Sequence, residues 1–376
     1  MGGGSLRVLM VSKACIVGTY QKKLEVMAGA APDLSLVVVV PPAWRDERGT
    51  TTLERVHTRG YQLEVQPIWF NGSFHLHLYP GLGRTIARVR PDLVHIDEEP
   101  YNLATYHANV IARRRGARTL WFSWQNLARG YPPPFSWIER YNLRHVDHAI
   151  AGSRTAADVW RTKGYAGPLN VIPQFGVDPE IFSPDLDRAR RHDGVVHIAY
   201  VGRFVPEKGP DLLLQALART AGAWQATFLG SGPEAPEIPR QAAALGIADR
   251  VTVRDWLPST QMPEFYREID VLVLPSRTRS NWTEQFGRVL IEAMACEVTV
   301  VGSGSGEIPH VIGEAGIVFS EDDASALSEA LQDLIVSPER RRLLGRQGRE
   351  RVLKHYTQQR VAEATLAVYR EILASG

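Results

Sequence analysis

The sequence is poor in cysteine: its 376 residues include only Cys15 and Cys296, each in an apolar setting. Two separated cysteines exclude a disulfide framework and a cysteine-rich metal site, and they favour a reducing, cytoplasmic compartment. Long hydrophobic runs are also missing, since Leu34–Val40, the longest, is far below the ~18 residues of a membrane-spanning helix. The first five residues lack the charged and apolar regions of a signal peptide and are left out of the fold prediction.

A strong charge of one sign is absent as well. With 43 Lys and Arg against 41 Asp and Glu, the net charge is +2, so the composition does not favour a nucleic acid as partner. Residues 1–185 hold 21 basic and 16 acidic side chains, or +5, which leaves −3 for residues 186–376. With 44% hydrophobic and 22% charged residues the composition is globular, and the length predicts two or three domains.

What the sequence does have is a regular alternation of apolar runs with segments that can form helices. In the first half the runs are Leu6–Val11, Leu34–Val40, 63–68, Leu93–Ile96, 119–122 and 149–151. In the second half they are 197–201, 226–229, 251–253, Val271–Leu274 and 298–301. Strands that are apolar throughout and separated by helices indicate parallel sheets covered on both faces. The predicted class is therefore α/β, with two doubly wound halves.

The two series meet at residues 182–194, a polar segment without periodicity that we interpret as a linker. We expect an N-terminal domain over residues 1–185 and a C-terminal domain over residues 186–355. Residues 356–376 are expected to form a helix that crosses back to the N-terminal domain. Ligands of doubly wound sheets bind at the carboxyl ends of the strands, so the loops that follow strands are the places to look for a site.

Two cations lie in the loop after the first strand of the second series. Arg203 and Lys208 stand between that strand and a helix. A guanidinium fork and an ammonium group beside a helix N-terminus suit a diphosphate. A solvated turn is the alternative interpretation, but both charges lie where this fold class places its ligands.

The most informative stretch is residues 281–296, in which Glu284 precedes a helix and Glu292 lies inside it. A carboxylate among apolar neighbours is costly to bury without a partner, and either a ribose or a structural arginine would satisfy Glu292. Glu284 would project from the carboxyl end of a strand. Backbone amides for a phosphate would come from Phe286, Gly287 and Arg288.

At this point the sequence resembles glycosyltransferase family 4. The resemblance rests on Glu284-Gln-Phe-Gly-Arg-Val-Leu-Ile-Glu292 after Val-Leu-Pro-Ser276. Four landmarks agree in order and spacing: Gly-Arg203-Phe-Val-Pro-Glu-Lys208-Gly, Gly230-Ser-Gly232, Gly304-Ser-Gly306-Glu-Ile-Pro and Ile172-Pro-Gln-Phe-Gly176-Val-Asp178. The resemblance implies a GT-B fold, with two Rossmann-like domains facing across a cleft. It also implies retaining, metal-independent transfer of a sugar from a nucleotide-sugar co-substrate to an acceptor hydroxyl, without a cofactor.

The resemblance assigns the donor to the C-terminal half. Arg203 and Lys208 would hold the diphosphate and stabilise the departing nucleoside diphosphate, while Glu284 would contact the transferred sugar and Glu292 the ribose. Further donor contacts are implied at Gly18, Gly202, Gly230, Leu257, Gln285, Phe286, Gly287, Arg288 and Val289. Gly18 lacks the adjacent glycines that the family usually has.

The acceptor side departs from the family pattern. The family's usual His after the strand at 119–122 is absent, and Gln125 or Asn126 would hydrogen-bond in its place, although neither is a general base. In the family's front-face scheme the leaving phosphate deprotonates the acceptor, so the missing His is compatible with activity. Glu98 and Glu99 end another strand and are expected to orient the acceptor hydroxyl, with a solvated loop as the alternative for Glu99.

Charged and aromatic residues of the first half suggest peripheral contact with the inner face of an anionic membrane that carries a lipid-linked acceptor. We favour the alternative, a solvated helix face and a packed aromatic loop. The residues concerned are Arg84, Arg88, Arg90, Arg113, Arg114, Arg115, Arg118, Tyr131, Phe135, Trp137 and Tyr141.

Other functions remain open at this stage. Gly230-Ser-Gly232-Pro-Glu-Ala235 follows a strand and fits the dinucleotide fingerprint, so an oxidoreductase is one alternative, although it would give Glu284 and Glu292 no role. A sugar-nucleotide epimerase of related fold and a non-enzymatic binding protein are two more. His75 and His77 have same-face strand spacing but no third ligand, so we interpret them as structural and expect no metal site.

Overall fold

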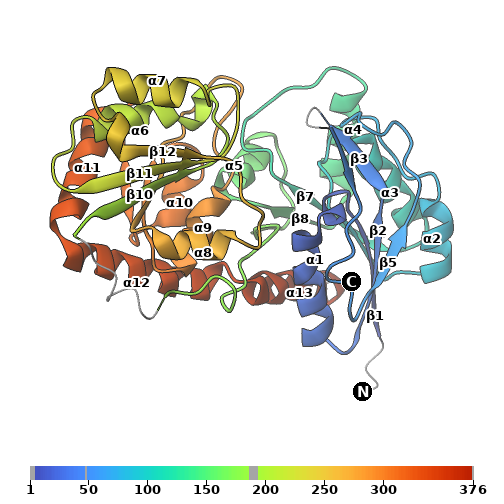
Figure 1. The fold of residues 1–376 in the computed structure, drawn as a ribbon. Helices are drawn as coiled ribbons and strands as arrows, with labels where there is room; N and C mark the ends of the chain where they lie inside the picture. The colour runs from blue at the N-terminus through green and yellow to red at the C-terminus, as the bar shows by residue number, and fades with distance from the viewer. Residues whose placement is uncertain (1–4, 47–48, 186–193, 375–376) are drawn as a thin grey trace. The chain divides into compact units, whose positions relative to one another are not determined.

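The computed structural model describes residues 5–46, 49–185 and 194–374, which form two compact units (Figure 1). The first unit comprises residues 1–176 and 358–376, and the second comprises residues 177–357. Most of the expected linker, residues 186–193, lies outside the described residues. Two parallel-sheet α/β units agree with the predicted fold class.

The segment just after Gly176 is held by the second unit. The backbone N–H of Val177 donates to the carbonyl of Tyr356 at 2.9 Å, and Arg267 donates to the carbonyls of Ile181 (3.0 Å) and Ser183 (2.9 Å). These contacts explain why the border between the units precedes residue 185, where the composition had suggested it.

A parallel sheet forms the core of the first unit. Its strands are β1 (Leu6–Val11), β2 (Leu34–Val40), β5 (Gln62–Val65), β6 (Leu93–Ile96), β7 (Arg118–Ser123), β8 (His148–Ala151) and β9 (Leu169–Val171). The spatial order is β5-β2-β1-β6-β7-β8-β9. The chain thus moves outward from β1 first on one side and then on the other, as in Rossmann-type sheets, and a switch point lies between β1 and β6.

Helices connect these strands, as the alternating pattern predicted. They are α1 (Gly18–Ala30), α2 (Leu82–Val89), α3 (Leu103–Arg114), α4 (Phe135–His145) and α5 (Arg154–Thr162). The antiparallel hairpin of β3 (Ala43–Asp46) and β4 (Gly49–Thr52) was not predicted. Its strands bury no residue and therefore show no apolar pattern.

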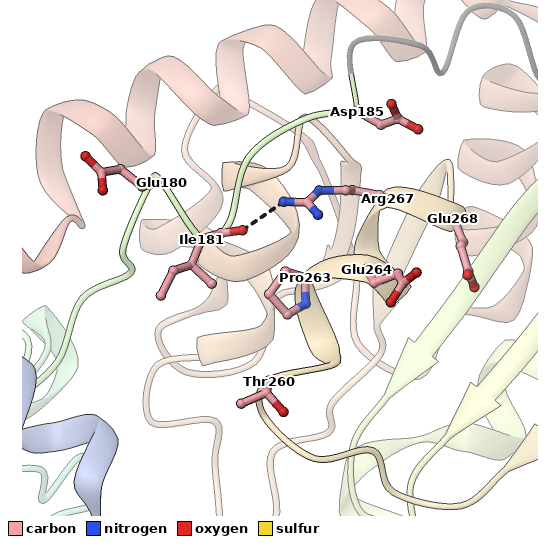
Figure 2. A pocket seen from close by; sticks show the side chains of 8 residues that line it. All are labelled: Glu180, Ile181, Asp185, Thr260, Pro263, Glu264, Arg267 and Glu268. Carbon is pink, nitrogen blue, oxygen red and sulfur yellow. Dashed lines mark hydrogen bonds between the residues drawn. The ribbon is translucent and has the colours of Figure 1, made fainter. Parts of the chain in front are cut away.

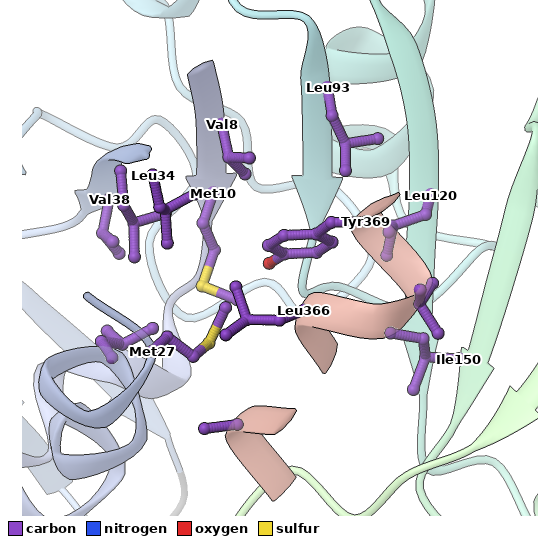
Figure 3. Packing of buried hydrophobic residues seen from close by; sticks show 14 of the residues in the cluster. Val8, Met10, Met27, Leu34, Val38, Leu93, Leu120, Ile150, Leu366 and Tyr369 are labelled. Atoms are coloured by element: carbon purple, nitrogen blue, oxygen red, sulfur yellow. The ribbon is translucent and has the colours of Figure 1, made fainter. Parts of the chain in front are cut away.

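Helix α13 (Gln358–Ala374) returns to the first unit and completes its core (Figure 3). Leu366 and Tyr369 point among the apolar side chains of β1, β2 and β6, and they are 4% and 0% exposed. The hydroxyl of Tyr369 shares a 2.7 Å hydrogen bond with Nδ1 of His95 on β6. The end of the chain is therefore an integral part of the first unit.

The second unit has a parallel sheet with the same strand pattern. Its strands are β10 (Val196–Val201), β11 (Trp224–Leu229), β12 (Val251–Arg254), β13 (Val271–Leu274), β14 (Thr299–Ser303) and β15 (Ile317–Phe319). The order is β12-β11-β10-β13-β14-β15, which places the switch point between β10 and β13. Strand β15 was not predicted, because it has only three residues and one buried side chain.

The helices of the second unit are α6 (Pro210–Leu217), α7 (Glu237–Ala244), α8 (Met262–Glu268), α9 (Arg288–Ala295), α10 (Ile308–Ile312), α11 (Ala324–Val336) and α12 (Pro338–His355). Helices α6 and α11 pack on the sheet through a continuous apolar cluster. Among the helices that the structure describes, none is both long enough and apolar enough to pass through a bilayer.

Candidate functional site

The switch point of the second unit brings together two of the predicted site residues. Because β10 pairs with β13, the loops that follow these strands are neighbours. Nζ of Lys208 donates to Oε2 of Glu284 at 2.5 Å, and the hydroxyl of Ser276 donates to the same oxygen at 2.9 Å. The ring centroid of Trp282 lies 4.9 Å from the ammonium group. Glu284 is thereby a buried carboxylate with two donors, in contact with a half-buried cation.

Glycines allow these loops to approach each other. Gly306 has φ +53°, and a Cβ there would lie 2.0 Å from the carbonyl oxygen of Glu284. Gly209 has φ +67°, and its Cβ would lie 2.2 Å from the carbonyl oxygen of Pro275. Any larger residue would push the loops apart, so these two glycines fix the positions of Lys208 and Glu284.

Arg203 lies in the same loop as Lys208 but is exposed. The hydroxyl of Tyr200 donates to the Arg203 carbonyl at 2.6 Å and holds the backbone of the loop. Within the described residues, the Arg203 guanidinium makes no hydrogen bond or ion pair. Its five N–H groups are therefore available to a ligand.

Glu292 lies on α9 and is 7% exposed. One carboxylate oxygen accepts from the hydroxyl of Tyr266 at 3.0 Å, and the other accepts from Nε of Arg288 at 2.7 Å. The structural arginine that the sequence left as one alternative is thus present, one helical turn away. Each oxygen still has a further lone pair, so a second interaction with ribose hydroxyls remains chemically possible.

The glycines after β11 serve internal packing. Gly230 has φ +151°, and a Cβ would lie 1.9 Å from the carbonyl oxygen of Gly202. A Cβ on Gly232 would lie 2.4 Å from the carbonyl oxygen of Phe204. Helix α7 begins only at Glu237. The match to a dinucleotide fingerprint therefore reflects close packing of two loops of this unit and does not show the tight strand-to-helix turn of a pyrophosphate site.

The remaining predicted donor residues lie on the loops before α8 and α9 and in the first turn of α9. Gly287 adopts the left-handed conformation at the N-terminus of α9, with φ 78°. Phe286 is buried, with its ring centroid 5.7 Å from that of Tyr356. Gln285 is exposed, whereas Leu257 and Val289 are half-buried.

In the first unit, Glu98 follows β6 and is enclosed completely. Its carboxylate pairs with Nζ of Lys13 and lies 3.3 Å from Nε2 of His77. Although burial alone would raise its pKa, the Lys13 ammonium and the contact with His77 hold the pKa at about 2. The ring centroid of Phe74 lies 4.6 Å from the Lys13 ammonium. Glu98 is thus engaged with residues of its own unit, and its expected contact with an acceptor would have to replace one of these partners.

The pKa of Glu99 is shifted in the opposite direction. Its carboxyl accepts hydrogen bonds from the hydroxyl of Ser123 and from the backbone N–H of Trp124, the latter at 2.8 Å. Burial outweighs these bonds and raises its pKa from 4.5 to about 7. Two adjacent glutamates therefore titrate far apart, a pattern that recurs at functional sites.

A hydrogen-bonded network at the carboxyl edge of the sheet contains residues that the sequence did not reveal. Nε1 of Trp124 donates to Gln174 at 3.0 Å, and Gln174 donates to Asp97 at 2.9 Å. Asp97 also accepts from the hydroxyl of Ser12 at 2.5 Å. Each residue follows a strand of the sheet, and Gln174 also lies in the landmark Ile172–Asp178, but neither signal predicted the network.

Gln125 and Asn126 follow β7, where the resemblance expected a His. The Gln125 side chain is 7% exposed and donates to the carbonyl of Leu127 at 2.9 Å. Its Oε1 atom is buried and has no hydrogen-bond partner among the described residues. A buried acceptor without a donor costs about 1–3 kcal/mol, which a ligand hydroxyl would offset. The neighbouring Asn126 is half-buried.

Gly18 begins α1, and its amide is already engaged. The N–H donates to Oε2 of Glu54 at 2.6 Å, and a Cβ at this position would collide with Val56 at 2.5 Å. The carboxylate of Glu54 thus occupies the helix N-terminus where the resemblance implied a diphosphate.

The two histidines of the 70s loop contact different neighbours. His77 approaches Glu98, as described above, whereas the His75 ring packs against Tyr101, Tyr131 and Phe135. Over residues 5–46, 49–185 and 194–374, His, Cys, Asp and Glu side chains form no group of three or more that could hold a metal ion.

A separate pocket of about 620 Å³ lies beside α8 in the second unit (Figure 2). Arg267 reaches across it to the carbonyl of Ile181. Four carboxyl side chains line the pocket, namely Glu180, Asp185, Glu264 and Glu268. This excess of negative charge disfavours a nucleoside diphosphate, so the pocket is no candidate for the donor.

Two family models together match most of the chain. Residues 186–351 match the family model of the glycosyl transferases group 1, and residues 25–174 match that of the glycosyl transferase 4-like domain. A GDP-mannose-dependent alpha-(1-6)-phosphatidylinositol monomannoside mannosyltransferase of Mycolicibacterium smegmatis is 34% identical over 277 residues, or 68% of this chain and 71% of that protein. Alpha-maltose-1-phosphate synthase of the same organism is 31% identical over 281 residues, or 66% of this chain and 69% of that protein.

Solved structures share the whole fold. Anabaena HepE in complex with UDP superimposes with a TM-score of 0.75 at 15% identity and covers 97% of this chain and 100% of its own. Sucrose-phosphate synthase from Thermosynechococcus elongatus has a TM-score of 0.70 at 19% identity and covers 98% and 99%. The two units therefore have the GT-B fold.

Proposed function

The chain belongs to glycosyltransferase family 4, and from this premise we propose that it is a retaining, metal-independent transferase that moves a sugar from a nucleoside-diphosphate donor to an acceptor hydroxyl. The relatives' names and the UDP complexes of HepE support a nucleotide sugar as donor.

One observation carries the proposal: Lys208, Glu284 and Ser276 are joined at the switch point of the second unit, beside the exposed Arg203. Lys208 uses one of its three N–H donors on Glu284, so two remain for diphosphate oxygens. Arg203 offers a fork to the same group. Together they supply the positive charge that a departing diphosphate requires, a task that a metal ion performs in other enzymes.

Glu284 has a role that neither cation can fulfil. Its carboxylate is buried and accepts hydrogen bonds from Lys208 and Ser276, so its orientation is fixed before a donor arrives. Each carboxylate oxygen has two lone pairs, so a carboxylate held in this way can also accept from hydroxyls of the transferred sugar. We assign it to the positioning of that sugar over the diphosphate.

In the proposed reaction the bond between the anomeric carbon and the diphosphate oxygen breaks, and a bond to the acceptor oxygen forms on the same face. The acceptor proton passes to the leaving diphosphate, so the products are a glycoside and a nucleoside diphosphate. The unsatisfied Oε1 of Gln125 would accept from a substrate hydroxyl. Glu99, with a pKa of about 7, would accept from another hydroxyl when it is ionised.

The proposal is tested by replacing Glu284. Glu284→Ala should abolish transfer while the circular dichroism spectrum is retained, whereas Glu314→Ala, which removes an exposed carboxylate of the same unit, should leave the rate unchanged. Transfer at the parental rate by Glu284→Ala would refute the role.

The anomeric configuration of the product, followed by NMR, tests retention. EDTA should not change the rate, and complete loss of activity with EDTA would refute the metal-free mechanism.

A panel of ligands identifies the donor. Thermal shifts with GDP, UDP, ADP and TDP, followed by hydrolysis of the matching sugar nucleotides, reveal the base, and GDP comes first because of the mannosyltransferase relative. An epimerase would convert the donor sugar without releasing the nucleoside diphosphate. A nicotinamide dinucleotide that stabilises the protein would favour the oxidoreductase, which the packing of Gly230 against Gly202 already argues against.

Peripheral membrane contact through the first unit is part of the proposal. Three aromatic side chains of this unit are more than half exposed, Trp69 (58%), Phe70 (59%) and Trp137 (62%). Aromatic rings prefer the membrane interface. Co-sedimentation with anionic vesicles that persists unchanged in Trp69→Ser/Trp137→Ser would contradict this contact.

A further inference from the structure

The amino-terminal edge of the first sheet carries an arginine-lined pocket that the proposed function does not use. The pocket has a volume of about 410 Å³, within the range of small-ligand sites. Its arginines are Arg7 on β1, Arg90 after α2 and Arg115 after α3, and its remaining walls include Ile86, Pro91 and Asp92. Figure 1 shows β1, α2 and α3 together in this unit. Glu98, Glu99 and Gln125 of this unit follow the carboxyl ends of strands, at the opposite edge.

Only one of the three arginines is neutralised. Arg7 forms a fork with Asp92, through Nε at 3.2 Å and Nη2 at 2.6 Å. Arg90 and Arg115 are exposed and make no side-chain hydrogen bond or ion pair with any described residue. The pocket therefore presents two guanidinium groups whose charge is not balanced by a neighbouring acid.

The helix termini reduce this charge but do not cancel it. Helices α2 and α3 both end at the pocket, and each C-terminus carries roughly half a negative charge. Two free guanidinium groups against two half charges leave a net charge of about +1. Compensation of the helix dipoles therefore does not account for both arginines.

The backbone at Arg90 gives an independent indication. Arg90 adopts the left-handed conformation, with φ 50° and ψ 58°, at a helix end where glycine is the usual residue. This conformation costs a side-chain-bearing residue about 1 kcal/mol or more. An arginine retained at such a position suggests that its side chain is used.

We propose that this pocket binds a phosphate group, held by forked hydrogen bonds from Arg90 and Arg115, with Arg7 fixed beside them by Asp92. Guanidinium groups match the geometry of phosphate oxygens better than ammonium groups do. The phosphate belongs either to a free metabolite or to a lipid headgroup, which share this chemistry. The site is distinct from the proposed donor site and does not depend on the proposed sugar transfer.

The test uses inorganic pyrophosphate and isothermal calorimetry at low ionic strength. The full chain carries Arg203→Ala in all samples, so that the proposed donor site contributes little. Saturable binding at one site per chain is expected, and Arg90→Gln/Arg115→Gln should weaken it at least tenfold. The matched control Arg84→Gln/Arg114→Gln removes the same charge from exposed positions that do not line the pocket, and it should change the affinity less than twofold. Absence of saturable binding, or equal weakening by both pairs, would overturn the proposal.

Vesicles separate the two sources of the phosphate. Co-sedimentation with phosphatidylglycerol vesicles that is lost in Arg90→Gln/Arg115→Gln and competed by pyrophosphate identifies a headgroup. Unchanged co-sedimentation together with weakened pyrophosphate binding identifies a soluble ligand, and either result supports a phosphate pocket. The rate of sugar transfer at saturating donor should be the same in Arg90→Gln/Arg115→Gln as in the wild type. Failure of the phosphate-pocket proposal can therefore be distinguished from failure of the proposed function.

Discussion

Glu99 offers a quantitative test of the first unit, because burial and hydrogen bonding act on its protonation in opposite directions. Burial raises its pKa from 4.5 to about 7 and outweighs the bonds from Ser123 and Trp124, which favour the charged form. At roughly 1.4 kcal/mol per pKa unit, the difference corresponds to about 3 kcal/mol.

The sign follows from the direction of the pKa change. Because the pKa is higher in the folded state, the neutral Glu99 carboxyl contributes stability fully below pH 4.5, and this contribution is lost as the pH rises through 7. Glu99→Gln has the same shape and stays neutral. Relative to the wild type, the variant should therefore gain about 3 kcal/mol in free energy of unfolding between pH 4.5 and pH 8.

Urea unfolding followed by tryptophan fluorescence at several pH values measures this gain. In protein labelled with ¹³C at the glutamate carboxyls, the resonance that is absent from Glu99→Gln should titrate near pH 7. Ser123→Ala removes a bond that favours the charged form and should move this midpoint upward. The reasoning would be refuted if the free energies of unfolding of the wild type and Glu99→Gln changed in parallel with pH, or if the Glu99 resonance titrated near pH 4.5.

Three other outcomes are expected. Leu366→Ala should destabilise the first unit by about 2–5 kcal/mol in urea unfolding, because it leaves a cavity where α13 packs, and a loss below 1 kcal/mol would contradict this packing. Gly230→Ala should destabilise the second unit by about 3 kcal/mol or more, because its Cβ would meet the Gly202 carbonyl, so an unchanged melting temperature would argue against that close approach. Glu54→Gln should lower the KM for the donor several-fold, because the Gly18 amide would no longer be held by a charged competitor, and a raised KM would count against a diphosphate contact there.

Most of the sheet architecture could be predicted because both faces of the central strands are buried. Strand β13 is wholly apolar and β1 and β2 contain one polar residue each, Arg7 and Ser35, so these strands show the pattern of parallel strands covered by helices. The hairpin of β3 and β4 has no such pattern, since its exposed strands are specified by pairing and not by burial. Strands without a buried face lack the hydrophobic pattern from which a strand is predicted.

The two candidate sites differ in predictability for a topological reason. Lys208 and Glu284 follow strands that are direct neighbours, so a motif in each loop and the strand order were enough to expect both residues at the same edge of the sheet, although their 2.5 Å contact was not predicted. In the first unit, Glu98 meets Lys13 and His77, and His77 lies on a long loop without regular structure. The strand order of a sheet does not determine where a residue of such a loop lies.

The consequence is chemical as well as geometric. Glu98 and Glu99 are adjacent and identical in the sequence, yet their pKa values are about 2 and about 7. At Glu98 the contacts with Lys13 and His77 outweigh the effect of burial, whereas at Glu99 burial outweighs the hydrogen bonds from Ser123 and Trp124. Which of two adjacent carboxylates can bind a hydroxyl is therefore decided by distant partners, and only a structure reveals them.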